Sequence, residues 1–330
     1  GTPGAAAGSA SAAEAAPDLI DAVISLAPVD FHGHKLEKTP FLMILPAADG
    51  DVITNEGARI YDRSEVTALP LWKSQFYIYG ADHNRFNREW LESDGAAHGF
   101  PNLLTRADQE RMLRAWSVLF FDHWFRGHTA NRAVFSGEAV VSGLPNDRIF
   151  PSFETADSYL VDDHQDANPW VNTVGGAVSE SGFVLFDEYP FTLGGAAYNS
   201  TFFHETDGLI AAWKKPKAEY FSEASGQPYD FVSFRVTQVY DPLNSTVDAM
   251  AMVVGVEAGG RFDTVTPKLI PYPYVAPFVT KSMMRTVRVP AACFVDGNNP
   301  IDLATIKGIW LAPHDRDEGI LGIDQLALSN

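Results

Sequence analysis

The chain has 330 residues, of which 46% are hydrophobic and 20% charged, a composition typical of globular proteins and enough for two domains. Its formal net charge of −18 argues against nucleic acid or an anionic membrane surface as a partner, because both would repel it. With Cys293 as its one cysteine, the chain can form no internal disulfide and holds no C-x-x-C motif. No apolar run is long enough to span a bilayer.

Residues 1–16 are rich in glycine, alanine and serine, and we expect this segment to be flexible. It lacks the charged start and the apolar core of a signal peptide. Ser9 and Ser11 lie here with no strand before them, so neither is expected to act as a nucleophile.

Three short apolar runs follow, and they predict buried strands of a parallel sheet. The runs cover residues 22–29, 41–45 and 75–79, and the last two are bounded by proline or glycine. A helix is expected between the second and third runs, over residues 55–66. This order makes a parallel crossover in which the polar loops leave from the carboxyl ends of the strands.

An aspartate follows the second run and a histidine follows the third. Asp49 and His83 should therefore lie at the edge where open α/β sheets place their chemistry. A carboxylate can fix the tautomer and orientation of an imidazole there, and the imidazole can act as a base toward a nucleophile. Asp51 is the alternative acid.

These segments resemble a known family. The Thr-Pro pair at residues 39–40, the strand and aspartate after it, and the later motif GADHNRFN look like the last two catalytic segments of α/β-hydrolases, especially dienelactone-hydrolase-like and polyester-hydrolase or cutinase-like esterases. The resemblance implies a Ser-Asp-His triad with Asp49, or its rival Asp51, as the acid and His83 as the base. It implies no cofactor for catalysis, and we expect a secreted or extracellular location.

The chain contains no G-x-S-x-G motif, the turn that exposes the serine in this family. In the family this turn lies one helix before the strand expected at residues 22–29. The resemblance therefore implies that the serine and the oxyanion hole belong to the N-terminal half of the hydrolase domain, as a separate, cleaved or omitted segment. We expect that half to be a partner, and the substrate to be a small or polymeric ester.

Three further residues are expected to line the substrate cleft. Asp30 and His32 lie in the loop after the first strand, and His98 lies in the loop 89–104. His98 is an alternative imidazole base, although no strand directly precedes it. His32 and His34 form an H-x-H pair that lacks further ligands at metal-site spacing.

A long helix is predicted from the capping sequence TRAD at residues 105–108 to Gly127. It resembles the terminal helix of a hydrolase domain, so we expect the C-terminal part of that domain to cover residues 17–130. From residue 131 the pattern changes to short alternating segments separated by turn residues. Many strands without helices indicate a β-sandwich of the jelly-roll type over residues 131–330, so the predicted fold class is α/β plus all-β.

The strands of this second domain are expected at residues 133–141, 183–191, 201–213, 231–240, 249–256, 283–294, 303–312 and 320–328. Five segments, DGLIAAW, YDFVSFRVTQVY, RTVRVPAACF, DLATIKGIWLAP and GILGIDQLALS, resemble successive strands of galactose-binding-like or carbohydrate-binding jelly rolls. The resemblance implies a structural calcium held by Asp324, or an aspartate that caps a neighbouring strand. Trp170, Tyr272 and Tyr274 could stack on sugar rings, although such residues in a sandwich usually pack inside it.

Two functions of different classes remain. The chain is either part of a serine hydrolase of ester or amide bonds, or a non-catalytic subunit that binds carbohydrate or another polymer. We prefer the hydrolase, because three parallel strands alone would leave a long bare edge that requires a partner segment. The sandwich is expected to fold by itself and to supply no catalytic group.

Overall fold

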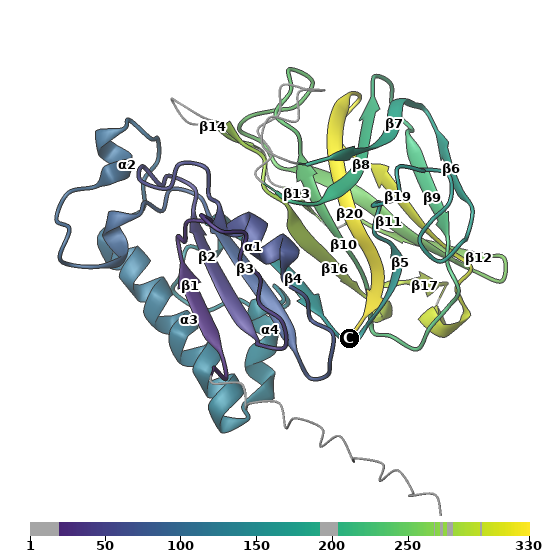
Figure 1. Cartoon of the computed structure of the whole chain (residues 1–330). Helices are drawn as coiled ribbons and strands as arrows, with labels where there is room; N and C mark the ends of the chain where they lie inside the picture. Colours follow the sequence, from purple (N-terminus) through teal and green to yellow (C-terminus); the bar gives the residue numbers. More distant parts are fainter. Residues whose placement is uncertain (1–19, 192–203, 267, 271–272, 276–279, 298) are drawn as a thin grey trace, which may run out of the picture.

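The computed structural model describes residues 20–191, 204–266, 268–270, 273–275, 280–297 and 299–330. An α/β unit and a β-sandwich lie side by side (Figure 1). The segment expected to be flexible at residues 1–16, and with it Ser9 and Ser11, lies outside the described residues, as does Tyr272. Within the described part, no helix is both long and apolar enough to cross a membrane.

The first sheet has four strands, in the order β1 (Val23–Leu26), β2 (Phe41–Pro46), β3 (Trp72–Ile78) and β4 (Ile149–Thr155). β1, β2 and β3 are parallel, as the sequence predicts, whereas β4 runs antiparallel to β3. β4 lies beyond the boundary expected after residue 130, so the first sheet extends into the second predicted domain. Pro151 makes this segment a poor strand candidate, but the edge of a sheet tolerates proline.

The helices are α1 (Gly57–Arg63), α2 (Asp94–Ala97), α3 (Arg106–Arg126) and α4 (Arg132–Phe135). Alternate residues of β2 face opposite sides of the sheet, and a helix covers each side. Met43 packs in a cluster with Tyr61 of α1, and Ile44 packs in a cluster with Trp116 of α3. Burial on both faces explains why β2 is apolar throughout, whereas the equally buried β3 also contains Lys73, Ser74 and Gln75.

The predicted ends of the long helix α3 are confirmed. Thr105 is its N-cap, and the hydroxyl of Thr105 accepts the Asp108 N–H at 3.1 Å. Gly127 ends the helix with a left-handed φ of 72°. The strand expected at residues 133–141 is wrong, because this segment begins with α4, whose Phe135 stacks on Trp72 beneath the first sheet.

The second unit is a β-sandwich of two six-stranded sheets. One has the order β16, β10, β20, β8, β7 with β5 paired to β20, and the other has the order β12, β11, β19, β9, β6 with β13 paired to β11. Two short hairpins, β14 with β15 and β17 with β18, complete the unit. The bounds of these strands are β5 (Ser158–Asp162), β6 (Val178–Ser181), β7 (Phe183–Pro190), β8 (Asp207–Trp213), β9 (Glu219–Glu223), β10 (Phe231–Gln238), β11 (Met250–Ala258), β12 (Arg261–Val265), β13 (Lys268–Ile270), β14 (Tyr274–Val275), β15 (Thr280–Lys281), β16 (Arg285–Pro290), β17 (Val295–Asp296), β18 (Asn299–Pro300), β19 (Gly308–Pro313) and β20 (Gly319–Ser329).

A buried group of charged residues joins the two units. Arg235 of β10 contacts Asp62 of α1 at 2.8 Å and Asp324 of β20 at 3.2 Å, and Asp62 also contacts Nδ1 of His204 at 2.8 Å. Burial raises the pKa of Asp324 to about 7. Burial also opposes ionisation of Asp62, but His204 and Arg235 outweigh it and hold the pKa of Asp62 well below its usual range.

Candidate active site

Asp49 lies in the loop after β2, and its side chain is completely buried. The loop is fixed to the end of β3 and to the loop after it, because the Ala47 N–H donates to the Ile78 carbonyl at 2.9 Å and the Ala48 N–H donates to the Ala81 carbonyl at 2.8 Å. Oδ1 of Asp49 accepts the N–H groups of Asp51 and Val52 at 2.9 and 2.6 Å. These bonds form a turn around the carboxylate and do not involve Oδ2, which can therefore bind a residue of the loop after β3.

His83 follows β3 and is that partner. Its Nδ1 lies 3.1 Å from Oδ2 of Asp49, within hydrogen-bond distance. The rival acid, Asp51, is 74% exposed and lies 3.9 Å from Nε2 of the same ring. The hydrogen bond that His83 donates to Asp49 is the main cause that raises the pKa of His83, and it outweighs the opposing effect of burial. The imidazole is thus hydrogen-bonded to Asp49, whereas Asp51 lies only at ion-pair distance on its other side.

A residue that the sequence analysis did not single out, Asp94, connects the two loops. Its Oδ2 accepts the N–H groups of Gly50 at 2.6 Å and His83 at 3.3 Å, and its Oδ1 accepts the Asn84 N–H at 2.9 Å. Asp94 is the first residue of α2, directly after the N-cap Ser93. A Ser-Asp pair at a helix start is a recognisable signal, but it indicates only the cap.

The sandwich also reaches this site. Nζ of the buried Lys281 donates to the carbonyl of Ala47 at 2.9 Å, just before Asp49, and lies 5.8 Å from the ring centre of Phe100. Burial lowers the pKa of Lys281 to about 7, and the negative charge of Asp49 opposes this shift. The second unit therefore supplies a contact to the loop that carries the candidate acid.

Asp30 and His32, two of the residues expected to line the cleft, have other surroundings in the structure. The Asp30 carboxylate is buried and forms an ion pair with Arg63 at 2.7 Å, so it supports the loop and does not line an open cleft. His32 is exposed, and its ring centre lies 5.7 Å from that of His34.

The third of these residues, His98, lies near the site. It is exposed at the end of α2, and a side chain added at Gly50 would come within 2.6 Å of its ring. On the other loop, the ring centre of the exposed Trp90 lies 5.6 Å from that of His83. His98 and Trp90 are thus the exposed rings beside the Asp49–His83 pair that the structure identifies.

In the sandwich, the residues expected to bind ligands have different environments. Asp324, proposed from the sequence as a calcium ligand, is buried and contacts Arg235, whose positive charge would repel a cation. Trp170 is half-exposed, whereas Tyr274 is buried and packs against Tyr79. Among the described residues, Asp162, His164 and Glu188 form the group with metal-ligand spacing.

No protein-family model and no curated protein matches the chain. Similar solved structures are carbohydrate-binding modules. The family 11 module of the cellulosomal cellulase Lic26A-Cel5E of Clostridium thermocellum is 12% identical with a TM-score of 0.33, covering 52% of this chain and 94% of the module. CBM28, specific for non-crystalline cellulose, is 13% identical with a TM-score of 0.33, covering 52% of this chain and 97% of the module.

The CBM22-1 xylan-binding domain of Paenibacillus barcinonensis Xyn10C is 9% identical with a TM-score of 0.31, and the match covers 52% of this chain and 94% of that domain. Values this low assign neither a ligand nor a function to the chain. The β-sandwich is established instead by the strand pairings described above.

Proposed function

We propose that Asp49 and His83 are the acid and the base of a serine hydrolase that cleaves ester bonds. The supporting observation is the 3.1 Å contact between Oδ2 of Asp49 and Nδ1 of His83. The two residues lie just after the carboxyl ends of the neighbouring parallel strands β2 and β3. In this arrangement the carboxylate keeps the imidazole proton on Nδ1, and Nε2 can take the proton of a nucleophilic hydroxyl. The same nitrogen would then return that proton to the departing alkoxide.

The proposal requires a serine from outside the described residues, because none of the serines within them bonds to His83. We propose that it belongs to the N-terminal half of the hydrolase domain and that this half docks along β1. Among the residues that the structure describes, β1 pairs with β2 alone, and its own residues, mostly apolar, are only half-buried. Phe31, shortly after this strand, is exposed. An edge strand with unpaired backbone groups is a template for a further strand.

The test is an activity assay of this chain together with that N-terminal half, using p-nitrophenyl esters and a fluorophosphonate. His83→Ala and Asp49→Asn should each lower turnover by about three orders of magnitude or more. Asp51→Asn, at the exposed neighbouring carboxylate, is the control and should retain most activity. The fluorophosphonate should label the N-terminal half and not this chain. Labelling of Ser9 or Ser11, or full activity of Asp49→Asn, would contradict the proposal.

A second candidate function is binding of carbohydrate or another polymer by the sandwich without catalysis. Trp170, in the loop between β5 and β6, is 50% exposed and its ring centre lies 5.6 Å from that of Phe186. An exposed indole supported from one side can stack on a sugar ring.

Affinity electrophoresis in soluble mixed-linked β-glucan or xylan tests this second function. Trp170→Ala should abolish retardation, whereas Trp90→Ala, an equally exposed tryptophan in the other unit, should leave it unchanged. Retardation that depends on Trp170, combined with no fluorophosphonate labelling of the assembled protein, would favour the binding subunit over the hydrolase.

A further inference from the structure

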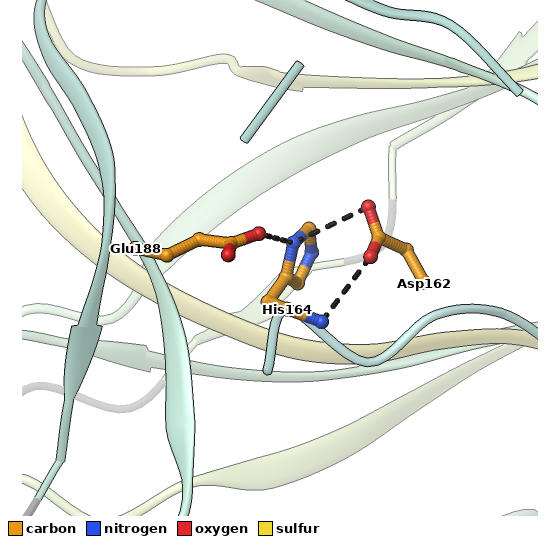
Figure 2. Close-up of side chains that lie close together, drawn as sticks. All are labelled: Asp162, His164 and Glu188. Carbon is orange, nitrogen blue, oxygen red and sulfur yellow. Dashed lines mark hydrogen bonds and ion pairs between the residues drawn. The ribbon is translucent and has the colours of Figure 1, made fainter. Parts of the chain in front are cut away.

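Two carboxylates and an imidazole meet inside the sandwich. Asp162 is the last residue of β5, His164 follows two positions later, and Glu188 lies on β7. None of the three side chains is more than 4% exposed. Figure 2 shows the imidazole between the carboxylates, with Nδ1 3.3 Å from Oδ2 of Asp162 and 3.3 Å from Oε1 of Glu188.

These separations, which are long for hydrogen bonds, also match those of adjacent ligands of one metal ion. With bonds of about 2.0 to 2.2 Å to nitrogen and oxygen, neighbouring ligand atoms of a tetrahedral zinc ion lie about 3.3 to 3.6 Å apart. The other carboxylate oxygens are already positioned by the backbone. Oδ1 of Asp162 accepts the His164 N–H at 3.2 Å, and Oε2 of Glu188 accepts the Asn168 N–H at 2.9 Å.

The charge of this group also calls for a cation. Among the residues that the structure describes, neither Asp162 nor Glu188 forms an ion pair with a lysine or an arginine. Two carboxylates buried together without a lysine or arginine partner are unfavourable. A divalent ion would neutralise both.

Tyr220 provides an independent observation beside the same group. Its ring centre lies 6.2 Å from that of His164, its side chain is buried, and its hydroxyl has no hydrogen-bond partner in the described part of the chain. A buried hydroxyl without a partner costs free energy, and a water on a metal ion would satisfy it.

We propose that Asp162, His164 and Glu188 bind one divalent transition-metal ion of the zinc type. An imidazole nitrogen suits zinc, whereas calcium takes six to eight oxygen ligands. The buried side chains leave no access for a substrate, so the ion is structural. It joins the end of β5 to β7 and fixes the start of the loop 163–177, which carries Trp170.

The test is isothermal titration calorimetry, in which zinc chloride is titrated into the full chain after EDTA treatment. Calcium chloride is present in excess as a competitor. We expect one zinc ion per chain and a melting temperature that rises with zinc. His164→Asn and Glu188→Gln should each weaken zinc binding about tenfold or more. If either variant fails to fold, the visible absorption of Co²⁺ bound to the wild-type chain decides, because tetrahedral coordination gives an intense band.

The control is the double variant His32→Asn and His34→Asn, which removes the exposed H-x-H pair as an adventitious zinc site. It should keep the bound zinc ion. The proposal is overturned if the wild-type chain binds no zinc, if His164→Asn and Glu188→Gln bind it as tightly as the wild type, or if calcium displaces it at equal concentration.

Discussion

Nζ of Lys281 lies 2.9 Å from the carbonyl oxygen of Ala47, although 234 positions separate the two residues in the chain. Ala47 is in the loop that carries Asp49, and Asp94 holds the same loop through the N–H of Gly50. The geometry of the candidate acid therefore depends on a side chain from the sandwich. The expectation that the sandwich folds by itself and supplies no catalytic group stays a prediction, but it does not include this contact.

Lys281→Met should change how stability depends on pH. The pKa of Lys281 is lowered from 10.5 to about 7 in the folded chain, so the unfolded chain binds more protons between these values. The wild type should therefore gain stability as the pH rises from about 7 toward 10, and the variant should lack this gain. Urea midpoints at pH 7 and pH 9 measure the effect. Lys214→Met, at an exposed lysine, should follow the wild type, and parallel curves for Lys281→Met would refute the assignment.

Asp49→Asn should lower the pKa of His83. The hydrogen bond to Asp49 is the largest cause that raises this pKa above 6.5. The stability that protonated His83 gains from its partner is present below about pH 6.5 and is lost as the pH rises through the folded-state pKa. An NMR titration of the ring resonances reports the pKa directly. Asp51→Asn should shift it less, and equal shifts in the two variants would show that Asp49 is not the main partner.

Asp94→Ala should loosen the His83 loop. The substitution removes the acceptors of three backbone N–H groups, and we expect a loss of about 1 to 3 kcal/mol in the free energy of unfolding. Amide hydrogen exchange at His83 and Asn84 should become faster. The exposed Glu92 offers a control, since Glu92→Ala should leave this exchange unchanged. Unaltered exchange in Asp94→Ala would mean that other contacts fix the loop.

Asp62→Asn should strongly destabilise the whole chain. It leaves the buried Arg235 with Asp324 as its one remaining charged partner among the described residues. Breaking a buried pair of this kind costs about 3 to 5 kcal/mol. Glu110→Gln, in a surface pair whose Arg88 side chain is 77% exposed, should cost less than about 1 kcal/mol. Urea unfolding compares the two, and similar small losses would show that Arg235 does not need Asp62.

The helices and strands of the α/β unit can be predicted from the sequence because each is encoded by a pattern within a short segment. The run at residues 41–45 predicts β2, the run at residues 75–79 predicts the second half of β3, the caps Thr105 and Gly127 predict α3, and strand ends predict where Asp49 and His83 meet. Nothing in these patterns specifies which distant segments pair.

The missed features all depend on such distant pairing. Asp94, Lys281 and β4 act through contacts with segments far away in the chain, and no local periodicity encodes them. Asp162, His164 and Glu188 come together because β5 and β7 belong to the same sheet, an arrangement that the spacing of the three residues does not reveal. The H-x-H pair was the more visible metal motif in the sequence, yet it lies exposed.

The position of β4 limits where the sandwich could be exchanged for that of another protein. Its backbone completes the first sheet, while its Ser152 hydroxyl donates to the Met284 carbonyl at 2.8 Å and its Phe153 N–H donates to the Thr286 hydroxyl at 2.8 Å. The chain thus crosses between its units within a strand that both share. An exchange of the sandwich with a junction at residue 130 would remove one border of the sheet that carries Asp49 and His83. A transferable sandwich would instead have to begin after Thr155 and accept a new surface beneath β16.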